Sequence, residues 1–428
     1  MHYFWIILYN LFFYPLFFII ALFTSFFNKK IKDSFIGKFH SIKILDRYFS
    51  SQEHLNKVYW FHVSSLGEFY QIAPILSFLK KNNPQITRIV SFSSPSGYNN
   101  VKNELYHLKF YLPFDFIWSI ISAFKIIKPD KIIFSSYDLW PNLLFLSRYY
   151  NITTILTSLR IPSVSKKNNI ILKSFYQSFY RLLNSIYTIT SNDEARLRSL
   201  MNGVEEIPDI YTLGNPRFDF VKDEFEKKNV DIPKIDILKR KDTIIIASSH
   251  EEDDKVVIPS LIKLLNLNSG WNVLYVPHDL DPKPIENIKK QFNKGGIKPV
   301  LFTGNHKDIP NQKVTIIRSI GLLANLYWIS KISYVGGGFS TGIHNLMEPA
   351  IAKLPIIFGP RNQNAPEAEQ LINNRGGFLI QNSNDFFLIL DKLIKDDKRI
   401  IKASQSSRSI IESNLGATQK IIKKILDG

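Results

Sequence analysis

The sequence predicts an α/β protein made of two doubly wound domains, each with a parallel sheet covered by helices. A chain of 428 residues is longer than a domain with a single hydrophobic core usually is, so we expect two domains of roughly 150–200 residues. From Val58 onward, short β-branched or aromatic runs alternate with helical patterns, which is typical of parallel βαβ units. A second series of the same kind begins after Gly214–Pro216.

The first series contains five predicted strands with amphipathic segments between them. The strands are Val58–Ser65, Thr87–Ser94, Lys131–Ser136, Ile152–Ser158 and Ile186–Thr190. Helical periodicity covers Phe69–Lys81 and Asp193–Met201.

The second series has five more predicted strands, which are Thr243–Ser248, Asn272–Pro277, Val314–Arg318, Ile332–Val335 and Pro355–Phe358. The charged stretch Asp223–Lys241 lacks a clear period, so we expect the linker there or just before it. From Asp385 to the end the pattern is helical and basic. We therefore expect a domain over residues 29–220 and a second over 221–428, with ligands at the carboxyl ends of the strands.

The amino-terminal segment, residues 1–28, predicts a membrane anchor. It contains no Lys, Arg, Asp or Glu, and Tyr3–Phe27 exceeds the roughly 20 apolar residues that cross a bilayer. A cleaved signal peptide fits poorly, because no basic residue precedes the apolar run and no small-residue cleavage site follows it. Basic residues from Lys29 to Arg47 predict a cytoplasmic location for the rest of the chain. An interfacial helix or hairpin around Pro15 is the alternative.

Composition limits the classes of partner. Lys and Arg total 54 against 37 Asp and Glu, a net charge of +17 that suits an anionic membrane surface or an acidic substrate. Compositional bias of the genome accounts for part of this charge. The sequence shows no basic patch interleaved with aromatic residues, so we expect no nucleic-acid partner. With no cysteine, disulfides and thiol nucleophiles are excluded.

The first candidate for chemistry is the segment His62–Glu68, where a predicted strand ends and a helix begins. Glu68 would then lie at the carboxyl end of a strand, where a lone carboxylate can act as a general base. The alternative is that Glu68 is only a first-turn residue favoured by the helix dipole.

The second candidate is the glycine-rich segment Val335–Pro349, with a helix expected from about Asn345. Such a turn can present backbone N–H groups to a phosphate, and Glu348 can accept hydrogen bonds from ribose hydroxyls. The spacing matches neither a dinucleotide fingerprint nor a P-loop. A tight structural turn is the alternative.

Two further groups follow predicted strands. In Tyr137–Asn142, Asp138 is either an N-cap or a residue of the cleft, and Pro141 suits a first helical turn. His250 and His278 also follow strands, but no third ligand has the spacing of a metal site, so we expect no metal.

Together these segments resemble the Kdo transferase family, GT-B glycosyltransferases that move Kdo, an acidic eight-carbon sugar, from CMP-Kdo to lipid A precursors. The resemblance covers nearly the whole chain. It is carried in order by His62–Glu68, Ser136–Asn142, Gly214–Asp219, Ala247–Glu252 and Thr341–Pro349. The segments Ser93–Tyr98 and Val335–Asn345 look like the Bacteroidetes branch.

The resemblance implies a GT-B fold, in which two Rossmann-like domains face a cleft, with an amino-terminal domain that binds the acceptor. It implies an inverting transfer of Kdo from CMP-Kdo to a precursor of the lipid IVA type, at the cytoplasmic side of the inner membrane and without metal or cofactor. Glu68 matches the proton acceptor, and Asp138 and Arg217 match positions that steady the transition state. The residues matching the CMP pocket are Pro277, His278, Ile320, Gly321, Leu322, Asn345, Leu346, Met347 and Glu348.

Three motifs depart from the family pattern. Ser136 replaces an acid and Asp138 shortens another, His278 follows Pro277 without an arginine between them, and Ile320–Leu322 lacks an acid. These departures bear on donor affinity more than on reaction type. Two alternatives stay open, a GT-B transferase for another nucleotide sugar and a non-catalytic membrane-bound relative.

Overall fold

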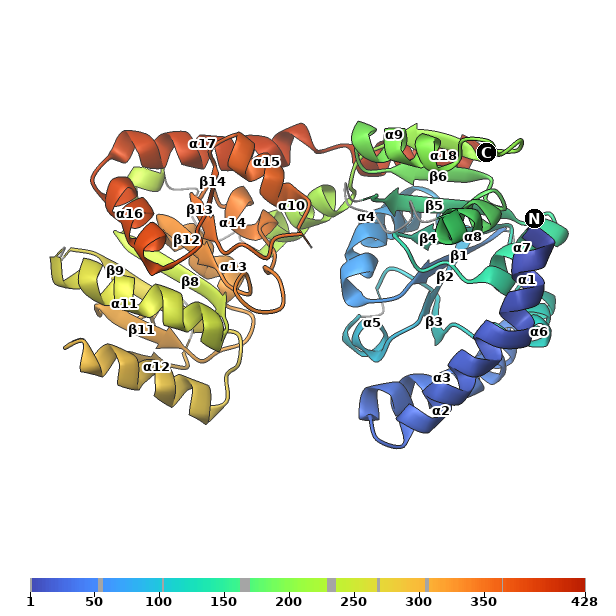
Figure 1. Ribbon diagram of the computed structural model, residues 1–428, viewed down its shortest axis with the longest axis horizontal. Helices are drawn as coiled ribbons and strands as arrows, with labels where there is room; N and C mark the ends of the chain where they lie inside the picture. Colours follow the sequence, from blue (N-terminus) through green and yellow to red (C-terminus); the bar gives the residue numbers. More distant parts are fainter. Residues whose placement is uncertain are drawn as a thin grey trace. The chain divides into compact units, whose positions relative to one another are not determined.

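A computed structural model describes residues 2–52, 57–101, 104–161, 170–228, 236–267, 270–304, 308–363 and 365–427. The chain forms two compact units. Unit 1 comprises Met1–Phe220 and Leu415–Gly428, and unit 2 comprises Val221–Asn414 (Figure 1).

Unit 1 is built on a seven-stranded parallel sheet in the order β3-β2-β1-β4-β5-β6-β7. Its strands are β1 (Lys57–Val63), β2 (Ile86–Phe92), β3 (Leu108–Tyr111), β4 (Lys131–Ser135), β5 (Thr153–Leu159), β6 (Ser185–Thr188) and β7 (Asp209–Thr212). The sheet starts with β1, next to the central strand β4, and the chain moves outward to β3 and then returns to β4 on the other side of β1. This reversal makes the sheet doubly wound, with its switch point between β1 and β4.

Alternation along the strands supplies a core on each face of this sheet. In β1, Tyr59, Phe61 and Val63 face one core, whereas Val58 and Trp60 face the other. The first core lies under α4 (Leu66–Asn82) and α18 (Ala417–Asp427). The second lies under α3 (Lys29–Phe49), α6 (Ile117–Ile127), α7 (Pro141–Tyr149) and α8 (Ile170–Tyr180), and Figure 1 shows α4 on the opposite side of the sheet from α6 and α7. The shorter helices α5 (Pro95–Asn100) and α9 (Ser191–Leu200) follow β2 and β6.

The amino-terminal segment is a continuous helical rod packed along one side of unit 1. It consists of α1 (His2–Leu8), the π-helical turn η1 (Tyr9–Phe13) and α2 (Tyr14–Ser25), and Tyr3–Ser25 is long and apolar enough to cross a membrane. No hairpin forms at Pro15, which occupies the first turn of α2, where a missing N–H is tolerated. One side of the rod contacts α7, α8 and α3, and its other side is an exposed row of Phe, Leu and Ile side chains.

Polar contacts fix the rod to unit 1. The Trp5 indole N–H donates to Ser174 Oγ (3.0 Å), and the Tyr9 hydroxyl donates to Asp115 Oδ2 (2.9 Å). The side-chain amides of Asn10 and Asn142 exchange two hydrogen bonds of 2.8 Å. Because three residues of one rod are held by three separate partners, its register on unit 1 is well specified.

Unit 2 has a second seven-stranded parallel sheet, in the order β10-β11-β9-β8-β12-β13-β14. Its strands are β8 (Thr243–Ser249), β9 (Asn272–Pro277), β10 (Val300–Phe302), β11 (Val314–Ile317), β12 (Ile332–Val335), β13 (Ile356–Phe358) and β14 (Gly377–Leu379). The switch point lies between β8 and β12. Thus the two-sheet α/β architecture expected from the sequence is present.

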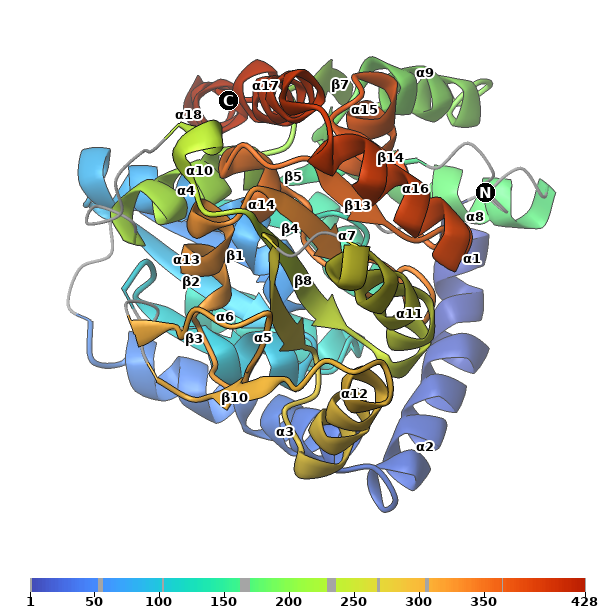
Figure 2. The same cartoon turned by 90° about the vertical axis from the view of Figure 1, so that its left-hand side faces the viewer.

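The helices of unit 2 are η3 (Ile237–Lys239), α11 (Glu251–Leu267), α12 (Pro282–Lys294), α13 (Leu323–Ile329), α14 (Met347–Ile351), α15 (Glu367–Asn373), α16 (Ser383–Ile394) and α17 (Asp397–Ser413). Helices α12, α11 and α16 lie side by side (Figure 2). Helix α10 (Arg217–Lys228) runs through the point where unit 1 passes into unit 2.

Two segments differ from the prediction. The expected linker Asp223–Lys241 is helical in its first part, because α10 continues to Lys228, while residues 229–235 lie outside the described residues. Residues 415–428, expected in the domain 221–428, belong to unit 1. The physical reason is that α18 buries Ile421, Ile422 and Ile425 in the core under α4.

Candidate active site

The switch point of unit 1 brings two of the expected site residues together. Glu68 lies in the first turn of α4, just after β1, and Asp138 lies in the loop between β4 and α7. Because β1 pairs directly with β4, both carboxyl groups sit at the same end of adjacent strands, where ligands of doubly wound sheets bind. Ser136, at the start of the Asp138 loop, has a left-handed φ of 61°, an uncommon conformation for a non-glycine residue.

Asp138 is held by a chain of buried side chains. His62 Nε2 lies 3.0 Å from Asp138 Oδ2, and His62 Nδ1 lies 2.8 Å from Ser91 Oγ. The Trp60 indole N–H donates to the same Ser91 oxygen (2.7 Å), so the Ser91 hydroxyl hydrogen is free to point at Nδ1. In this arrangement the Nε2–H of His62 donates to Asp138.

The Asp138 carboxylate is thereby kept ionised. Burial raises its pKa, but the hydrogen bond and charge of His62, the hydroxyl of Ser93 (2.6 Å) and the charge of Lys38 outweigh burial and lower the pKa to about 2. Of the two alternatives for Asp138, capping is excluded, because Trp140 is the N-cap residue of α7 and Pro141 begins the helix.

The Glu68 carboxylate faces the same end of the sheet. Its Oε2 accepts a hydrogen bond from the Ser64 backbone N–H (2.6 Å), and Ser65 caps the helix by accepting from the Glu68 N–H. Burial raises the pKa of Glu68, the Ser64 hydrogen bonds oppose that shift, and the nearby charge of Asp138 reinforces it. A carboxylate with a raised pKa is a stronger base than an exposed one, as proton abstraction requires.

Arg217 is placed differently. It is the first residue of α10 and follows β7, which lies three strands from β4 at the edge of the sheet. Its backbone N–H donates to Asn215 Oδ1 (3.0 Å). Among the described residues, no contact joins its guanidinium to Glu68 or Asp138.

In unit 2 the expected nucleotide residues follow three strands, β9, β11 and β12, of the same parallel sheet. His278 follows β9, which ends at Pro277, and the turn Ile320–Leu322 follows β11. The segment Asn345–Glu348 follows β12. There Asn345 Nδ2 donates to Glu348 Oε1 (3.0 Å), and Asn345 Oδ1 accepts from the Met347 N–H (3.0 Å). Leu346 is buried below them, whereas Ile320 is almost fully exposed and Gly321 has a φ of 85°.

The glycine-rich turn is packed against backbone. A Cβ on Gly336 would lie 2.3 Å from the Ser248 carbonyl oxygen, and one on Gly338 would lie 2.6 Å from Gly359. The Gly337 N–H donates to the buried carboxylate of Asp253 (2.7 Å), which also accepts from the His250 N–H (2.9 Å). The close contacts explain why glycine is needed at Gly336 and Gly338, since a side chain would clash with backbone. The Gly337 N–H is already bonded to Asp253 and is not available to a phosphate, which favours the tight-turn alternative at that position.

Three histidines come together beside this turn. His250 Nε2 and His344 Nε2 are 3.0 Å apart, and the ligand nitrogens of His250, His278 and His344 all lie within 4.8 Å of one another. Burial and the neighbouring histidines lower the pKa of His344 to about 4 and lower that of His278, so both rings are neutral at pH 7. Neutral imidazoles can bind a metal ion. Sequence spacing did not reveal His344 as a third nitrogen, because it comes from a distant part of the sequence, and the absence of a metal stays a prediction.

Sequence reasoning missed three residues of these sites. Ser93 and Lys38 act on Asp138, and Asp253 organises the glycine-rich turn. Ser93 follows β2, beside β1, and its place after a predicted strand was a usable signal. Asp253 lies within an acidic first helical turn, where a buried carboxylate cannot be told from exposed neighbours by sequence alone. Ser136, which replaces an acid of the family pattern, donates to Gln71 Oε1 (2.7 Å).

Comparison with known proteins identifies the relatives of this chain. Residues 42–220 match the family model described as 3-deoxy-D-manno-octulosonic-acid transferase (kdotransferase). Curated 3-deoxy-D-manno-octulosonic acid transferases align over most of the chain. The protein of Haemophilus influenzae is 25% identical over 84% of this chain and 84% of its own. That of Aquifex aeolicus is 24% identical over 86% of this chain and 95% of its own. The chain is a relative of the Kdo transferases.

Solved structures establish the fold. The UDP-GlcNAc 2-epimerase of Neisseria meningitidis superposes with a TM-score of 0.60 at 15% identity, covering 87% of this chain and 100% of its own. A glycosyltransferase from Rickettsia africae gives a TM-score of 0.56 at 16% identity, covering 87% and 99%. Two parallel sheets, these neighbours and the apolar amino-terminal helix confirm the expected GT-B class of fold.

The family relation supports a glycosyltransferase. The matched range, 42–220, contains Glu68, Asp138 and Arg217, so all three expected catalytic positions fall within the region that the family shares. The Bacteroidetes branch stays a prediction.

Proposed function

We propose that this relative of the Kdo transferases moves Kdo from CMP-Kdo to a lipid A precursor of the lipid IVA type, with inversion at the anomeric carbon. The observation that carries the proposal is the pair of carboxylates at the switch point of unit 1. One of them, Asp138, is kept ionised by His62, and the other, Glu68, has a raised pKa. Different environments for two neighbouring carboxyl groups are a usual sign of different chemical roles.

Glu68 is the base in this proposal. Its carboxylate takes the proton of an acceptor hydroxyl, and the hydroxyl oxygen forms a bond to the anomeric carbon of Kdo. The bond from that carbon to the phosphate oxygen breaks at the same time, and CMP leaves with the electron pair. The Ser64 N–H fixes the orientation of the carboxylate, which lowers the entropic cost of reaching a reactive geometry.

Asp138 and Arg217 steady the charges that develop in the transition state. A permanently ionised Asp138 favours positive charge on the sugar carbon as its bond to phosphate breaks. A guanidinium at Arg217 suits a phosphate leaving group and the carboxylate of the donor sugar. In unit 2, Pro277, His278, Ile320–Leu322 and Asn345–Glu348 bind CMP in this proposal, and no metal or cofactor takes part.

Location follows from the amino-terminal rod. Its exposed row of Phe, Leu and Ile side chains supports membrane association, and the basic residues after it favour the cytoplasmic side of the inner membrane for the two units. An enzyme held at that surface and a phosphorylated glycolipid acceptor in the same membrane encounter each other by diffusion in the plane of the membrane.

Transfer from enzymatically generated CMP-Kdo to a lipid A precursor tests the proposal, with Glu68→Gln beside the wild type. Glutamine keeps the size of the side chain and can still accept from Ser64, but it cannot take a proton. We expect a loss of about 10²–10⁴ in kcat with little change in KM. Glu286→Gln, at an exposed position of α12, is the matched control.

Other outcomes separate the alternatives. Product from the wild type with a different nucleotide sugar, and none with CMP-Kdo, would replace the donor. Binding of CMP-Kdo without product from any acceptor would indicate a non-catalytic relative. Equal rates for wild type and Glu68→Gln would keep the reaction and remove Glu68 as its base.

A further inference from the structure

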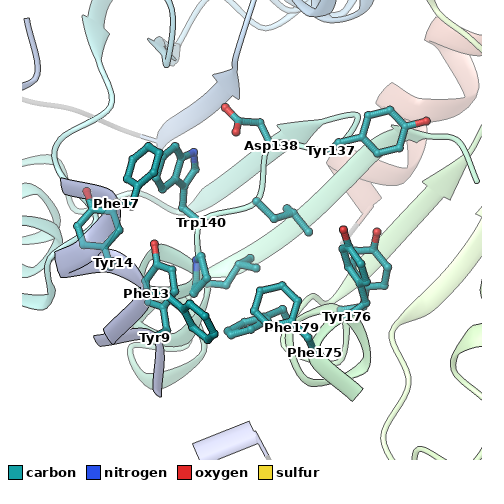
Figure 3. Close-up of a pocket in the computed structure, with 14 residues that line it drawn as sticks. Tyr9, Phe13, Tyr14, Phe17, Tyr137, Asp138, Trp140, Phe175, Tyr176 and Phe179 are labelled. Carbon is teal, nitrogen blue, oxygen red and sulfur yellow. The ribbon is translucent and has the colours of Figure 1, made fainter. Parts of the chain in front are cut away.

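Two apolar pockets lie beside the expected catalytic end of unit 1, and the amino-terminal rod forms a wall of each. Pocket A, of about 540 Å³, lies between η1, α2 and α8, with Phe13, Phe17, Phe175 and Phe179 in its lining (Figure 3). Pocket B, of about 600 Å³, lies between α2, α3 and the loop after β2, with Phe18, Ala21 and Phe114 in its lining. Both volumes fall within the roughly 300–1,000 Å³ of small-molecule sites.

The pockets share three lining residues. Trp140 lines both, together with Tyr14 and Phe17, so its indole forms part of the partition between them. Pocket A reaches Asp138 itself, which Figure 3 shows beside Tyr137 along one edge of the pocket. Pocket B reaches Ser93, whose hydroxyl donates to Asp138 (2.6 Å). Two apolar spaces therefore end at the same carboxylate.

Each pocket is bordered by the exposed apolar face of the rod. Phe13, Phe17 and Ile20 line the pockets and are still 48%, 54% and 53% exposed. The same face continues through Leu16, Ile19 and Phe23, none of which lines pocket A or pocket B. A hydrocarbon chain can thus pass from a membrane against this face into either pocket without crossing water.

Basic side chains line pocket B but not pocket A. Lys30 and Lys38 are the cations in the lining of pocket B. The Lys38 ammonium donates to the Leu112 carbonyl oxygen (3.2 Å) and lies 4.9 Å from the centre of the Trp140 ring. A ligand that fits these features is apolar along two branches and carries an anionic group at Lys30 and Lys38 rather than at the Asp138 carboxylate, which describes a phosphorylated, multiply acylated lipid.

We propose that pockets A and B hold acyl chains of the acceptor glycolipid, one on each side of Trp140, so that its sugar lies at Asp138 and Glu68. This inference rests on the proposed function and adds to it the part of the acceptor that is recognised. The rod then has two tasks, since it contacts the membrane and forms a wall of the chain-binding site. Acceptor specificity follows from the acyl chains as well as from the sugar hydroxyl.

Photolabelling of the full chain tests the placement without requiring turnover. The probe is a lipid A precursor that carries a diazirine at the end of one acyl chain, presented in detergent micelles. We expect crosslinks in α8 and on the pocket-lining residues of α2 and α3. Crosslinks confined to Leu16, Ile19 and Phe23 would overturn the proposal, as would equal labelling of the pockets by a phospholipid with the same diazirine chain.

Kinetics of a pocket-filling variant give the second test. Ala21→Trp adds bulk inside pocket B, whereas Leu16→Trp adds the same indole to the exposed face of the same helix. We expect Ala21→Trp to raise KM for the acylated acceptor by about tenfold and to leave kcat/KM for the deacylated headgroup unchanged. Leu16→Trp should alter neither. Thr24→Trp fills the same pocket one turn further along if Ala21→Trp does not fold.

The two proposals fail in different ways. Pocket labelling without Kdo transfer would keep the lipid site and refute the reaction. Kdo transfer with equal KM for acylated and deacylated acceptors would keep the reaction and refute the lipid site.

Discussion

The role of Asp138 could not be decided from the sequence and is decided by its contacts in the structure. From the sequence alone, capping and a role in the site were equally reasonable, because both place an acid before a helix. The structure separates them, since the carboxylate turns away from α7 toward His62 and Ser93. These partners come from β1 and from the loop after β2, and no local pattern around residue 138 could have revealed them.

The coupling of Asp138 to Glu68 has a measurable consequence in the pH profile. Glu68 must be ionised to accept a proton, so kcat/KM rises with pH as Glu68 loses its own proton. Burial and the charge of Asp138 both raise the pKa of Glu68. Asp138→Asn removes that charge, so we expect the acidic limb of the profile to move to lower pH, while the maximal rate falls by at least about tenfold. An acidic limb that stays in place or moves to higher pH would contradict this coupling.

The three histidines of unit 2 lead to a second prediction at the residue scale, which concerns the effect of metal ions on activity. The proposed reaction needs no metal, so chelator treatment should leave the transfer rate within about twofold of the untreated enzyme. Added Zn²⁺ should inhibit, because His250, His278 and His344 offer ligand nitrogens within 4.8 Å beside the expected nucleotide residues. Calorimetry of Zn²⁺ with wild type and His344→Gln should show binding that weakens in the variant. Loss of activity with chelator, restored by Zn²⁺, would make the metal part of the mechanism.

At the scale of elements, the sequence predicted the inner strands and missed the outer ones. All ten predicted strands are present, and the four that were missed are β3, β7, β10 and β14. Each of these four is the terminal strand of its sheet. They have only three or four residues with mixed burial, as in the exposed–buried–half-buried–exposed pattern of β7. An edge strand is covered less completely than a central one, so it lacks the continuous apolar run that identifies a buried parallel strand.

The amino-terminal rod was predicted as a helix, but its attachment was not. Its apolar face gives a strong hydropathy signal, whereas the attachment depends on isolated polar residues matched to distant partners. Asp115 is the main partner, because its buried carboxylate accepts from the Tyr9 hydroxyl and from the backbone N–H groups of Asn142 and Leu143. Each of these contacts joins segments more than 25 residues apart, beyond the reach of a local pattern.

Replacing Asp115 should therefore loosen the rod and the start of α7 together. Asp115→Ala leaves two buried N–H groups without an acceptor, at a cost of about 2–4 kcal/mol in the free energy of unfolding. Urea unfolding in detergent measures the loss, and limited proteolysis should cut the variant first within the rod. Asp33→Ala, an exposed acid on α3, is the control and should change stability by less than about 0.5 kcal/mol. Equal stability of the two variants would refute the attachment.

At the scale of the molecule, the segment Gly214–Asp219 joins parts of the chain that are far apart in sequence. The Asp219 carboxylate accepts from the backbone N–H groups of Gly416 and Thr418 (2.8 Å each) and so fixes the start of α18. Sequence reasoning treated this segment only as a site motif. Its structural task depends on residues almost 200 positions away, which explains why the final helix was assigned to the wrong half of the chain.

Matched core substitutions can verify this division. Ile421→Ala in α18 should lower the stability of unit 1 by about 2–4 kcal/mol and leave unit 2 unchanged. Ile410→Ala, a comparably buried isoleucine in α17, should do the reverse. Hydrogen exchange followed by mass spectrometry reports each unit separately. Faster exchange in unit 2 for Ile421→Ala would place α18 in the wrong unit.

Because α18 belongs to unit 1 but follows unit 2 in the sequence, it also sets the order in which the two units can complete their folding during synthesis. Unit 2 is an insertion within unit 1, so its residues have all been translated before Leu415. The apolar surface of α4 that receives Ile421, Ile422 and Ile425 stays uncovered until α18 has left the ribosome. Unit 1 is therefore begun before unit 2 and completed after it. The nascent chain must keep that surface from aggregating while the whole of unit 2 is translated.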